Sequence, residues 1–204
     1  MDTFPSPPGI GVYHDLKWAM ERVFAQAGDI EVRVALPSGN IGPGDLRLGT
    51  SALVVALARG DDPPHPDGIV SLVDPRDAAV GIARLAVRDE TPARVILSAA
   101  SVRLHPLMAV LARRYGVATP RAPLSASAAR ELADRSEEQA LSTRTRAALV
   151  REIVDLVNHG VLLDGSLAER SLGVHYRHFS TSLADFEAWA HRLGFLNPPP
   201  EARP

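Results

Sequence analysis

The sequence predicts an α/β fold with a smaller, mainly helical C-terminal part. Up to residue 117, short apolar runs typical of buried strands alternate with longer segments of helical periodicity, as in layered α/β proteins. From residue 118, a proline- and serine-bearing stretch leads into sequence with a mostly helical pattern. We therefore divide the 204 residues into an α/β region, 1–117, and a helical region, 118–204.

The α/β region carries signals for both helices and strands. Helices are expected at residues 13–27, 51–59, 75–87 and 105–115, and strands at residues 31–36, 68–73 and 93–98. Asp74 stands at the N-cap position of the third helix, and Gly116 stands where the fourth helix should end. The first eleven residues are rich in proline and glycine, so we expect an irregular lead-in there.

The helical region contains two strongly marked helices. One is expected at residues 144–159, with an apolar stripe formed by Leu149, Ile153, Leu156 and Val157. The last helix should begin at a cap provided by Ser182, end before Gly194, and turn inward Leu183, Phe186, Trp189 and Leu193. Residues 118–127 are interpreted as a linker and residues 198–204 as a disordered tail.

The composition is that of a soluble globular protein, with 46% hydrophobic and 23% charged residues. A net charge of -2 without a basic run argues against nucleic acid as a partner. The absence of cysteine excludes disulfides, thiolate catalysis and cysteine-ligated zinc. The apolar stretch 52–58 is too short to span a bilayer, and the start of the chain lacks the pattern of a secretory signal. We expect a cytoplasmic protein that does not bind membranes.

Tyr13 and Lys17 form the most suggestive pair of polar residues. They lie four positions apart at the start of a predicted helix, so both side chains share one face and can reach one ligand. A phenol has an ordinary pKa near ~10, and a neighbouring ammonium favours its ionised form, which makes it more useful as an acid or base at neutral pH. Lys17 is the single lysine of the chain, which makes a chance coincidence with a tyrosine at this spacing less frequent.

Several segments in order resemble those of extended short-chain dehydrogenases/reductases, the NAD-dependent epimerase/dehydratase group. Residues 11–17 resemble the family's Y-x-x-x-K segment, and residues 37–45 resemble its P-x-x-x-x-G-P-x-D segment. Residues 70–79 are similar to the V-x-V-x-D-V-A segment, and residues 163–194 to the closing pair of helices. The likeness is to dihydroflavonol-reductase-like and nucleotide-sugar-epimerase-like members. It implies a truncated Rossmann-like short-chain dehydrogenase fold, represented by its C-terminal part.

The resemblance also implies roles for individual residues. Tyr13 would be the catalytic acid/base, and Lys17 would bind the nicotinamide ribose and act on Tyr13. Residues beside the nicotinamide end of NAD(P) would be Pro37, Ser38 and Asn40. Residues turned toward the substrate would be Asn40 and Asp45. The expected substrate is a small carbonyl compound, a sugar or a natural product.

The chain departs from the family's pattern at its beginning. The family's glycine-rich turn is not completed, because Gly9 and Gly11 are followed by His14 where G-x-G-x-x-G requires a glycine. The catalytic serine or threonine that precedes the tyrosine is not matched either, since Ser6 lies in a proline-flanked loop. The family's first strands are also missing, so we expect an exposed sheet edge, covered by a partner chain or by a homo-oligomer.

Two classes of function therefore remain open. In the first, the chain is part of an oxidoreductase or epimerase that uses a nicotinamide cofactor. In the second, it works without that cofactor, as a cyclase, isomerase or lyase with Tyr13 as acid/base, or as a non-catalytic binding partner.

The remaining polar clusters favour structural interpretations. His175 and His178 have a spacing found in metal sites, but no pair of carboxylates accompanies them, so we expect a loop surface and no metal. The loop 39–44 lacks the Lys-Ser/Thr ending of a phosphate-binding P-loop. Trp18, next to Lys17, is interpreted as a core or edge residue.

Overall fold

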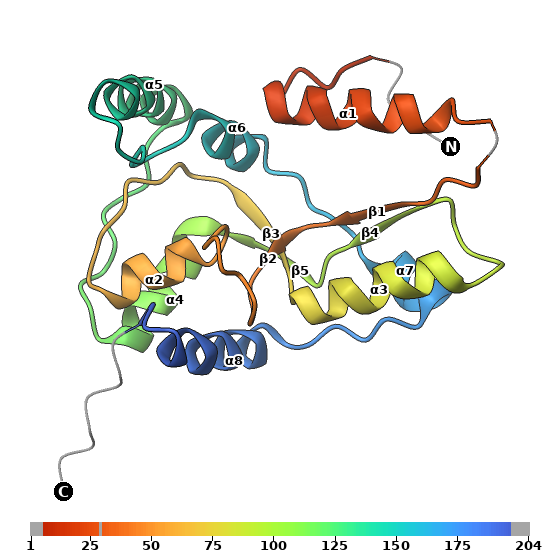
Figure 1. Cartoon of the computed structure of the whole chain (residues 1–204). Coiled ribbons are helices and arrows are strands. Elements are labelled where there is room, and N and C mark those ends of the chain that lie inside the picture. Colours follow the sequence, from red (N-terminus) through yellow and green to blue (C-terminus); the bar gives the residue numbers. More distant parts are fainter. Residues whose placement is uncertain (1–5, 29, 197–204) are drawn as a thin grey trace, which may run out of the picture.

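The computed structural model describes residues 6–28 and 30–196 as a mixed α/β protein (Figure 1). The predicted tail, and the first five residues of the predicted lead-in, lie outside the described residues. The helices are α1 (Val12–Ala25), α2 (Ala52–Ala58), α3 (Pro75–Val87), α4 (Leu104–Tyr115), α5 (Ala126–Thr143), α6 (Arg151–His159), α7 (Ser166–Leu172) and α8 (Phe179–Arg192). The strands are β1 (Val34–Pro37), β2 (Gly39–Asn40), β3 (Ile69–Val73), β4 (Arg94–Leu97) and β5 (Ala100–Arg103).

The strands form two small sheets. In one, β1 pairs with β4 in parallel, and Pro37 lies opposite Leu97 at the carboxyl ends. In the other, β3 is central, parallel to β2 and antiparallel to β5. α1 lies over one face of the β1–β4 pair, and α3 and α7 lie over the other (Figure 1). The layered α/β prediction is confirmed in this arrangement of helices on both sides of a parallel pair.

Three groups of buried side chains hold the elements together. The largest joins β3 to α2, α4 and α8 around Met108, Leu111 and Phe186. A second packs α3 and α7 against the β1–β4 pair around Leu97 and Leu172. A third lies between α5 and α6. The division at residue 117 stays a prediction, although α7 and α8 pack against elements that precede it.

The strongest local signals of the α/β region are confirmed. Asp74 accepts a hydrogen bond from the Arg76 backbone N–H at 2.9 Å, and α3 begins at Pro75 as expected. α4 ends at Gly116, which adopts the left-handed conformation with φ 65°. Strand β5 was not predicted. Its four residues carry no apolar run, and it exists because it pairs with β3.

The helix predicted at residues 144–159 is wrong over its first half, because α6 begins only at Arg151. The Ser136 hydroxyl accepts hydrogen bonds from the backbone N–H groups of Ala148 and Leu149, at 2.8 and 3.2 Å. These contacts tie the segment to α5 and use donors that a helix would need. The predicted stripe changes with it, since Ile153 is exposed while Leu149 is buried. The linker predicted at residues 118–127 ends at residue 125, because Ser125 is the N-cap of α5.

The prediction that Ser182 caps the last helix is also wrong. α8 begins three residues earlier at Phe179, and its N-cap residue is His178. Ser182 lies inside the helix, is buried, and hydrogen bonds to the carboxylate of Asp74. Leu183 and Phe186 are buried as predicted, whereas half of the Leu193 side chain is exposed. No helix among residues 6–28 and 30–196 combines the length and apolar character needed to cross a membrane.

We predict that Asp74 stabilises the fold in a pH-dependent way. The Asp74 side chain is fully buried, and burial alone would raise its pKa. Hydrogen bonds from Arg76 and Ser182 outweigh burial and hold the pKa of Asp74 at about 2 instead of 3.8. A lowered pKa means that this stabilisation is complete above pH ~4–5 and is lost as the pH falls toward ~2; it amounts to about 2 kcal/mol.

Chemical denaturation of wild type and Asp74→Asn between pH 7 and pH 2.5 measures this contribution. The difference in unfolding free energy should stay constant above pH ~5 and shrink steadily below it. Asp185→Asn is the matched control, because Asp185 pairs with the same Arg76 but is partly exposed, and such pairs contribute within about 1 kcal/mol. A difference that does not change with pH would contradict the assignment.

A second pH effect is expected from the pair His65 and His105. Nε2 of His65 lies 3.0 Å from Nδ1 of His105, and Nδ1 of His65 lies 3.2 Å from the carbonyl oxygen of Pro63. Neutral His65 therefore donates to Pro63 and accepts from His105. Burial is the largest cause that lowers the pKa of His65, and the charges of His105 and Arg121 lower it further. The hydrogen bond to Pro63 and the charge of Asp62 act in the opposite direction but do not outweigh burial.

Because the pKa of His65 is lowered in the folded state, we expect wild type to lose stability through this group as the pH falls from 7.5 to 5.5. His65→Gln should lose less over the same interval, since glutamine keeps a donor and an acceptor without titrating. Equal losses in both proteins, measured by urea denaturation, would show that His65 does not carry the effect.

Candidate functional site

Tyr13 and Lys17 lie in contact on the first two turns of α1. The Lys17 ammonium nitrogen is 5.4 Å from the centre of the Tyr13 ring, within the range of a cation–π contact. Both side chains are exposed. The Tyr13 ring also meets the edge of the His14 ring, with the centroids 5.6 Å apart. The predicted shared face is thus present, and a ligand can reach the phenol and the ammonium together.

α1 turns its more polar face toward the sheet. His14, Trp18 and Glu21 are half-buried, at positions that share one side of the helix. The Glu21 carboxylate pairs with the Arg94 guanidinium at the start of β4, at 3.1 Å. None of the residues of α1 is buried, and five of its apolar side chains are exposed: Val12, Leu16, Met20, Val23 and Phe24. This orientation holds Tyr13 and Lys17 at the surface of the molecule rather than inside it.

The segment from Pro37 to Asp45 begins at the carboxyl end of β1. The Ser38 backbone N–H donates to the Leu97 carbonyl at 3.0 Å, which extends the pairing with β4 by one residue. The Ser38 hydroxyl oxygen is buried and has no hydrogen-bond partner among the described residues. Asn40 lies in β2, opposite Val73, and is half-buried. Ligands of parallel α/β sheets bind at such carboxyl ends.

Asp45 has a structural task in this segment. Its two carboxylate oxygens accept from the backbone N–H groups of Gly49 and Ser51, at 3.0 and 3.3 Å, and so fix the turn before α2. Gly42 is required by close packing, because a Cβ there would lie 2.5 Å from Cδ of Pro75. The substrate role of Asp45 stays a prediction. It would have to share the carboxylate with these backbone donors.

Two residues near this segment were not singled out from the sequence. Ser98 directly follows β4, is 3% exposed, and its hydroxyl has no hydrogen-bond partner within residues 6–28 and 30–196. Tyr176 donates to the Gly165 carbonyl at 3.2 Å, and burial raises the pKa of its phenol. Ser98 could have been found because it ends an apolar strand. Tyr176 gave no signal, since its partner lies on a different segment.

The predicted site residues fall into two groups. Tyr13 and Lys17 contact each other on α1, and Pro37, Ser38 and Asn40 lie together at the ends of β1 and β2. Within the described ranges, no hydrogen bond or ion pair joins the first group to the second. The predicted site residues thus lie in two separate groups, one on α1 and one at the ends of β1 and β2.

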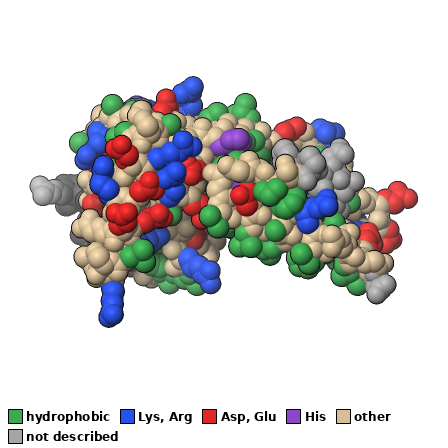
Figure 2. Space-filling view, turned by 90° about the horizontal axis from the view of Figure 1, so that it is seen from above, with side chains coloured by type: hydrophobic (Ala, Val, Ile, Leu, Met, Phe, Trp, Pro, Cys, Tyr) green, Lys and Arg blue, Asp and Glu red, His purple; other side chains and the backbone are tan. Residues whose placement is uncertain are grey.

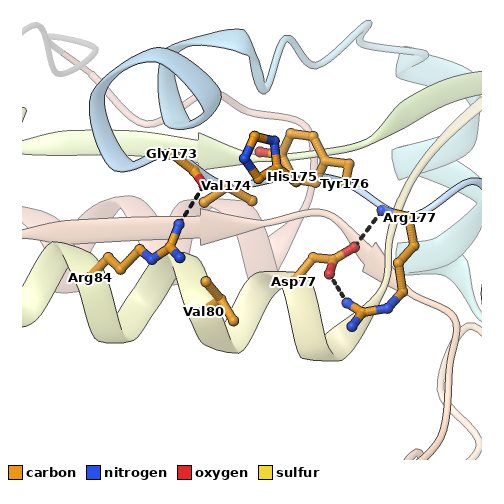
Figure 3. A pocket seen from close by; sticks show the side chains of 8 residues that line it. All are labelled: Asp77, Val80, Arg84, Gly173, Val174, His175, Tyr176 and Arg177. Carbon is orange, nitrogen blue, oxygen red and sulfur yellow. Dashed lines mark hydrogen bonds and ion pairs between the residues drawn. The ribbon is translucent and has the colours of Figure 1, made fainter.

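A groove of about 450 Å³ lies between α3 and residues 173–177 (Figure 3). Its charged side chains already have partners. The Asp77 carboxylate accepts from the Arg177 backbone at 2.7 Å and from the Arg177 guanidinium. Arg84 donates to the carbonyl groups of Leu172, at 3.1 Å, and Gly173. These contacts hold the end of α7 onto α3, so we interpret the groove as structural.

The histidines considered for a metal lie on the surface. His175 and His178 are both exposed, as expected for a loop, and the Nδ1 atom of His178 lies 2.7 Å from the Ser180 hydroxyl oxygen at the start of α8. Over the described part of the chain, no group of three or more histidine, aspartate or glutamate side chains is arranged to hold a metal ion.

Comparison with known proteins gives structural neighbours alone. No protein-family profile matches the chain, and no curated protein sequence matches it. A nucleoside-diphosphate-sugar epimerase from Pseudomonas aeruginosa superposes with a TM-score of 0.72 at 23% identity, over 95% of this chain and 60% of its own. The protein gox2253 superposes with a TM-score of 0.70 at 22% identity, over 92% and 58%.

A third neighbour is a double mutant of the dTDP-glucose 4,6-dehydratase DesIV from Streptomyces venezuelae, with NAD and DAU bound. Its TM-score is 0.60 at 18% identity, over 91% of this chain and 52% of that one. The chain thus spans between half and three fifths of the length of these three neighbours. Its fold is that of the corresponding part of NAD-dependent epimerase/dehydratase proteins, Rossmann-like, with a smaller and mostly helical C-terminal part.

Proposed function

We propose that the chain is the acid/base part of a short-chain-dehydrogenase-like enzyme that acts on a small carbonyl compound, a sugar or a natural product. The observation that carries the proposal is the contact between Lys17 and Tyr13, at 5.4 Å, on a fold shared with nucleotide-sugar epimerases and dehydratases. A cytoplasmic location belongs to the same proposal, because a chain without cysteine suits a reducing compartment.

Tyr13 carries the proton in this mechanism. Its hydroxyl gives a proton to a substrate carbonyl oxygen, or takes one from a carbinol, while the Lys17 ammonium lies 5.4 Å from the centre of its ring. The exposure of both groups lets a substrate approach directly. Lys17 has a second function in this proposal. Its ammonium has N–H donors left that can bind the hydroxyl groups of a ribose.

NAD(P) would supply the hydride chemistry when bound. The residues present fit its nicotinamide end in two respects. The Ser38 hydroxyl is buried without a partner at the carboxyl end of β1, and so can donate to a ligand there. Pro37 precedes it and offers an apolar surface without an N–H group, while Asn40 adds an amide on the neighbouring strand. Asp45 fits less well, because both carboxylate oxygens already accept from backbone groups.

A second candidate is a cofactor-independent catalyst, such as a cyclase, isomerase or lyase, or a non-catalytic binding partner. It is favoured by His14, which stands where the phosphate-binding turn has its last glycine and is half-buried on the sheet-facing side of α1. Proton transfer by Tyr13 does not itself require a hydride donor. In this case Tyr13 and Lys17 act without NAD(P), and the Ser38 hydroxyl has a structural role.

Calorimetric titration with NADH and with NADPH distinguishes the two candidates. Because the chain spans only part of its neighbours, we expect weak binding by wild type, with a Kd between about 0.1 and 1 mM. Lys17→Ala should weaken it at least tenfold, about 1.4 kcal/mol, through loss of the ribose donors. Tyr13→Phe should keep the affinity within about threefold.

Arg22→Ala is the matched control, since it removes another exposed cation from α1 and should leave the Kd within about twofold. If Lys17→Ala and Arg22→Ala behave alike, or wild type shows no binding to either nucleotide, a cofactor site in this chain alone is excluded. The second candidate would then be pursued with cofactor-free substrates.

A further inference from the structure

Two segments that are far apart in the sequence are joined beside α4. The loop between α2 and β3 and the connection between α4 and α5 lie side by side (Figure 1). The Leu124 backbone N–H donates to the His65 carbonyl at 2.8 Å, and the Asp67 N–H donates to the Leu124 carbonyl at 3.3 Å. We refer to this contact as the 65–124 clasp. Because Ser125 caps α5 directly afterwards, the clasp anchors the start of that helix.

The other strong contacts of α5 are made with α6. The two helices share a small core built around Ala129 and Ala133. Ion pairs add to it, among them Arg130 with Asp155 at 2.7 Å. Figure 2 shows charged side chains of both signs gathered over this part of the molecule. These contacts hold α5 on α6, whereas the clasp ties the start of α5 to the loop that leads into β3.

His65 lies beneath the clasp as its buried side chain. The residue is 4% exposed, and the Nδ1 atom of its ring lies 3.2 Å from the Pro63 carbonyl oxygen. Its Nε2 atom lies 3.0 Å from Nδ1 of His105, in the first turn of α4. The two rings stack with their centroids 5.3 Å apart and their planes 10° apart. The clasp therefore rests on a contact between two imidazoles.

The number of protons on the two rings decides whether this contact holds. When both rings are neutral, Nδ1–H of His65 donates to Pro63, and its Nε2 accepts from Nδ1–H of His105. One added proton keeps this hydrogen bond, because one ring of the pair still has a lone pair that accepts from the charged ring. With two added protons, both facing nitrogen atoms carry hydrogens and both rings are positive. Two donors then oppose each other across 3.0 Å, and the contact breaks.

The charged groups around the pair do not stabilise a second proton. The negative charge of Asp62 favours a proton on His65, but its carboxylate is engaged by the Arg121 guanidinium at 2.6 Å. That hydrogen bond is the main cause that lowers the pKa of Asp62, so the pair stays formed in weak acid. Arg121 itself adds positive charge beside His65. At the end of the loop, Asp67 pairs with Arg103, and both side chains are more than half exposed.

We propose that the His65–His105 pair is a proton-operated latch, which keeps the 65–124 clasp closed with up to one added proton and releases it when both rings are protonated. Opening moves His65 into water and breaks the two backbone hydrogen bonds of the clasp. The start of α5 is then free of the loop that leads into β3, while its contacts with α6 remain. Histidine charge changes put this transition between roughly pH 7 and pH 5. The latch is independent of the proposed function, because it uses no residue of the candidate site.

Hydrogen exchange of single backbone amides, measured by NMR, tests the latch. At pH 7.5 the Leu124 and Asp67 amides should be protected at least about tenfold relative to an unfolded chain, and at pH 5.0 less than about threefold. The Ile41 amide, which donates to the Val73 carbonyl at 3.0 Å, is the internal control. It should remain protected at least about a hundredfold at pH 5.0. Persistent protection of Leu124, or its loss together with that of Ile41, would overturn the proposal.

The variant His105→Gln should keep the clasp closed in acid. An uncharged amide can donate to the neutral ring of His65 and accept from the protonated ring, so two opposed charges no longer arise. Protection of the Leu124 amide at pH 5.0 should then stay within about threefold of its value at pH 7.5. His175→Gln is the matched control, because His175 is an exposed histidine in the loop before α8, and it should release Leu124 as wild type does. A release in His105→Gln equal to that of wild type would refute the latch.

The wild-type rings give a readout that needs no variant. Long-range proton–nitrogen NMR spectra report the protonation of each ring nitrogen. Both nitrogens of His65 should become protonated over the same pH interval in which the Leu124 amide loses its protection. A doubly protonated His65 ring, together with a doubly protonated His105 ring and a protected Leu124 amide, would show that the clasp does not depend on the pair.

Discussion

The hydrogen bonds of the buried Asp74 carboxylate fix the position of the last helix relative to the sheets. Asp74 follows β3, caps α3 through the Arg76 backbone at 2.9 Å, and hydrogen bonds to Ser182 in α8. Arg76 continues the network to Asp185 at 2.8 Å. The loop after β2 passes so close that a Cβ on Gly42 would lie 3.3 Å from the carboxylate. A buried charge is stable only when donors surround it, so these elements are fixed together.

The same network explains which parts of the fold could be predicted. α3 and α4 were correct because their caps, Asp74 and Gly116, act on their own helix. The cap assigned to Ser182 failed because that hydroxyl bonds to Asp74, which lies far away in the sequence. The predicted start of α6 was wrong for a similar reason, since the Ser136 hydroxyl accepts a hydrogen bond from the backbone N–H of Ala148, just before that helix. Periodicity reports local preference, and a side chain that bonds across the fold overrides it.

The candidate site divides along the same line. The Tyr13–Lys17 contact could be predicted, because a spacing of four on a helix fixes it. The position of Ser38 followed from the end of a strand, although its unpartnered hydroxyl became visible only in three dimensions. The commitment of Asp45 to the turn before α2, and the contact of Tyr176 with Gly165, depend on backbone groups that sequence patterns do not specify.

The orientation of α1 is the step that links fold to function. The periodicity of the sequence predicted the helix but not which of its sides faces the sheet. The side that faces the sheet carries Glu21, which pairs with Arg94. Five apolar side chains are thereby left in water, a state that hydrophobic free energy opposes. The Tyr13–Lys17 pair lies at the margin of that same surface, and it is exposed for the same reason. The exposure of these apolar side chains and the exposure of the candidate acid/base pair are therefore two consequences of one helix orientation.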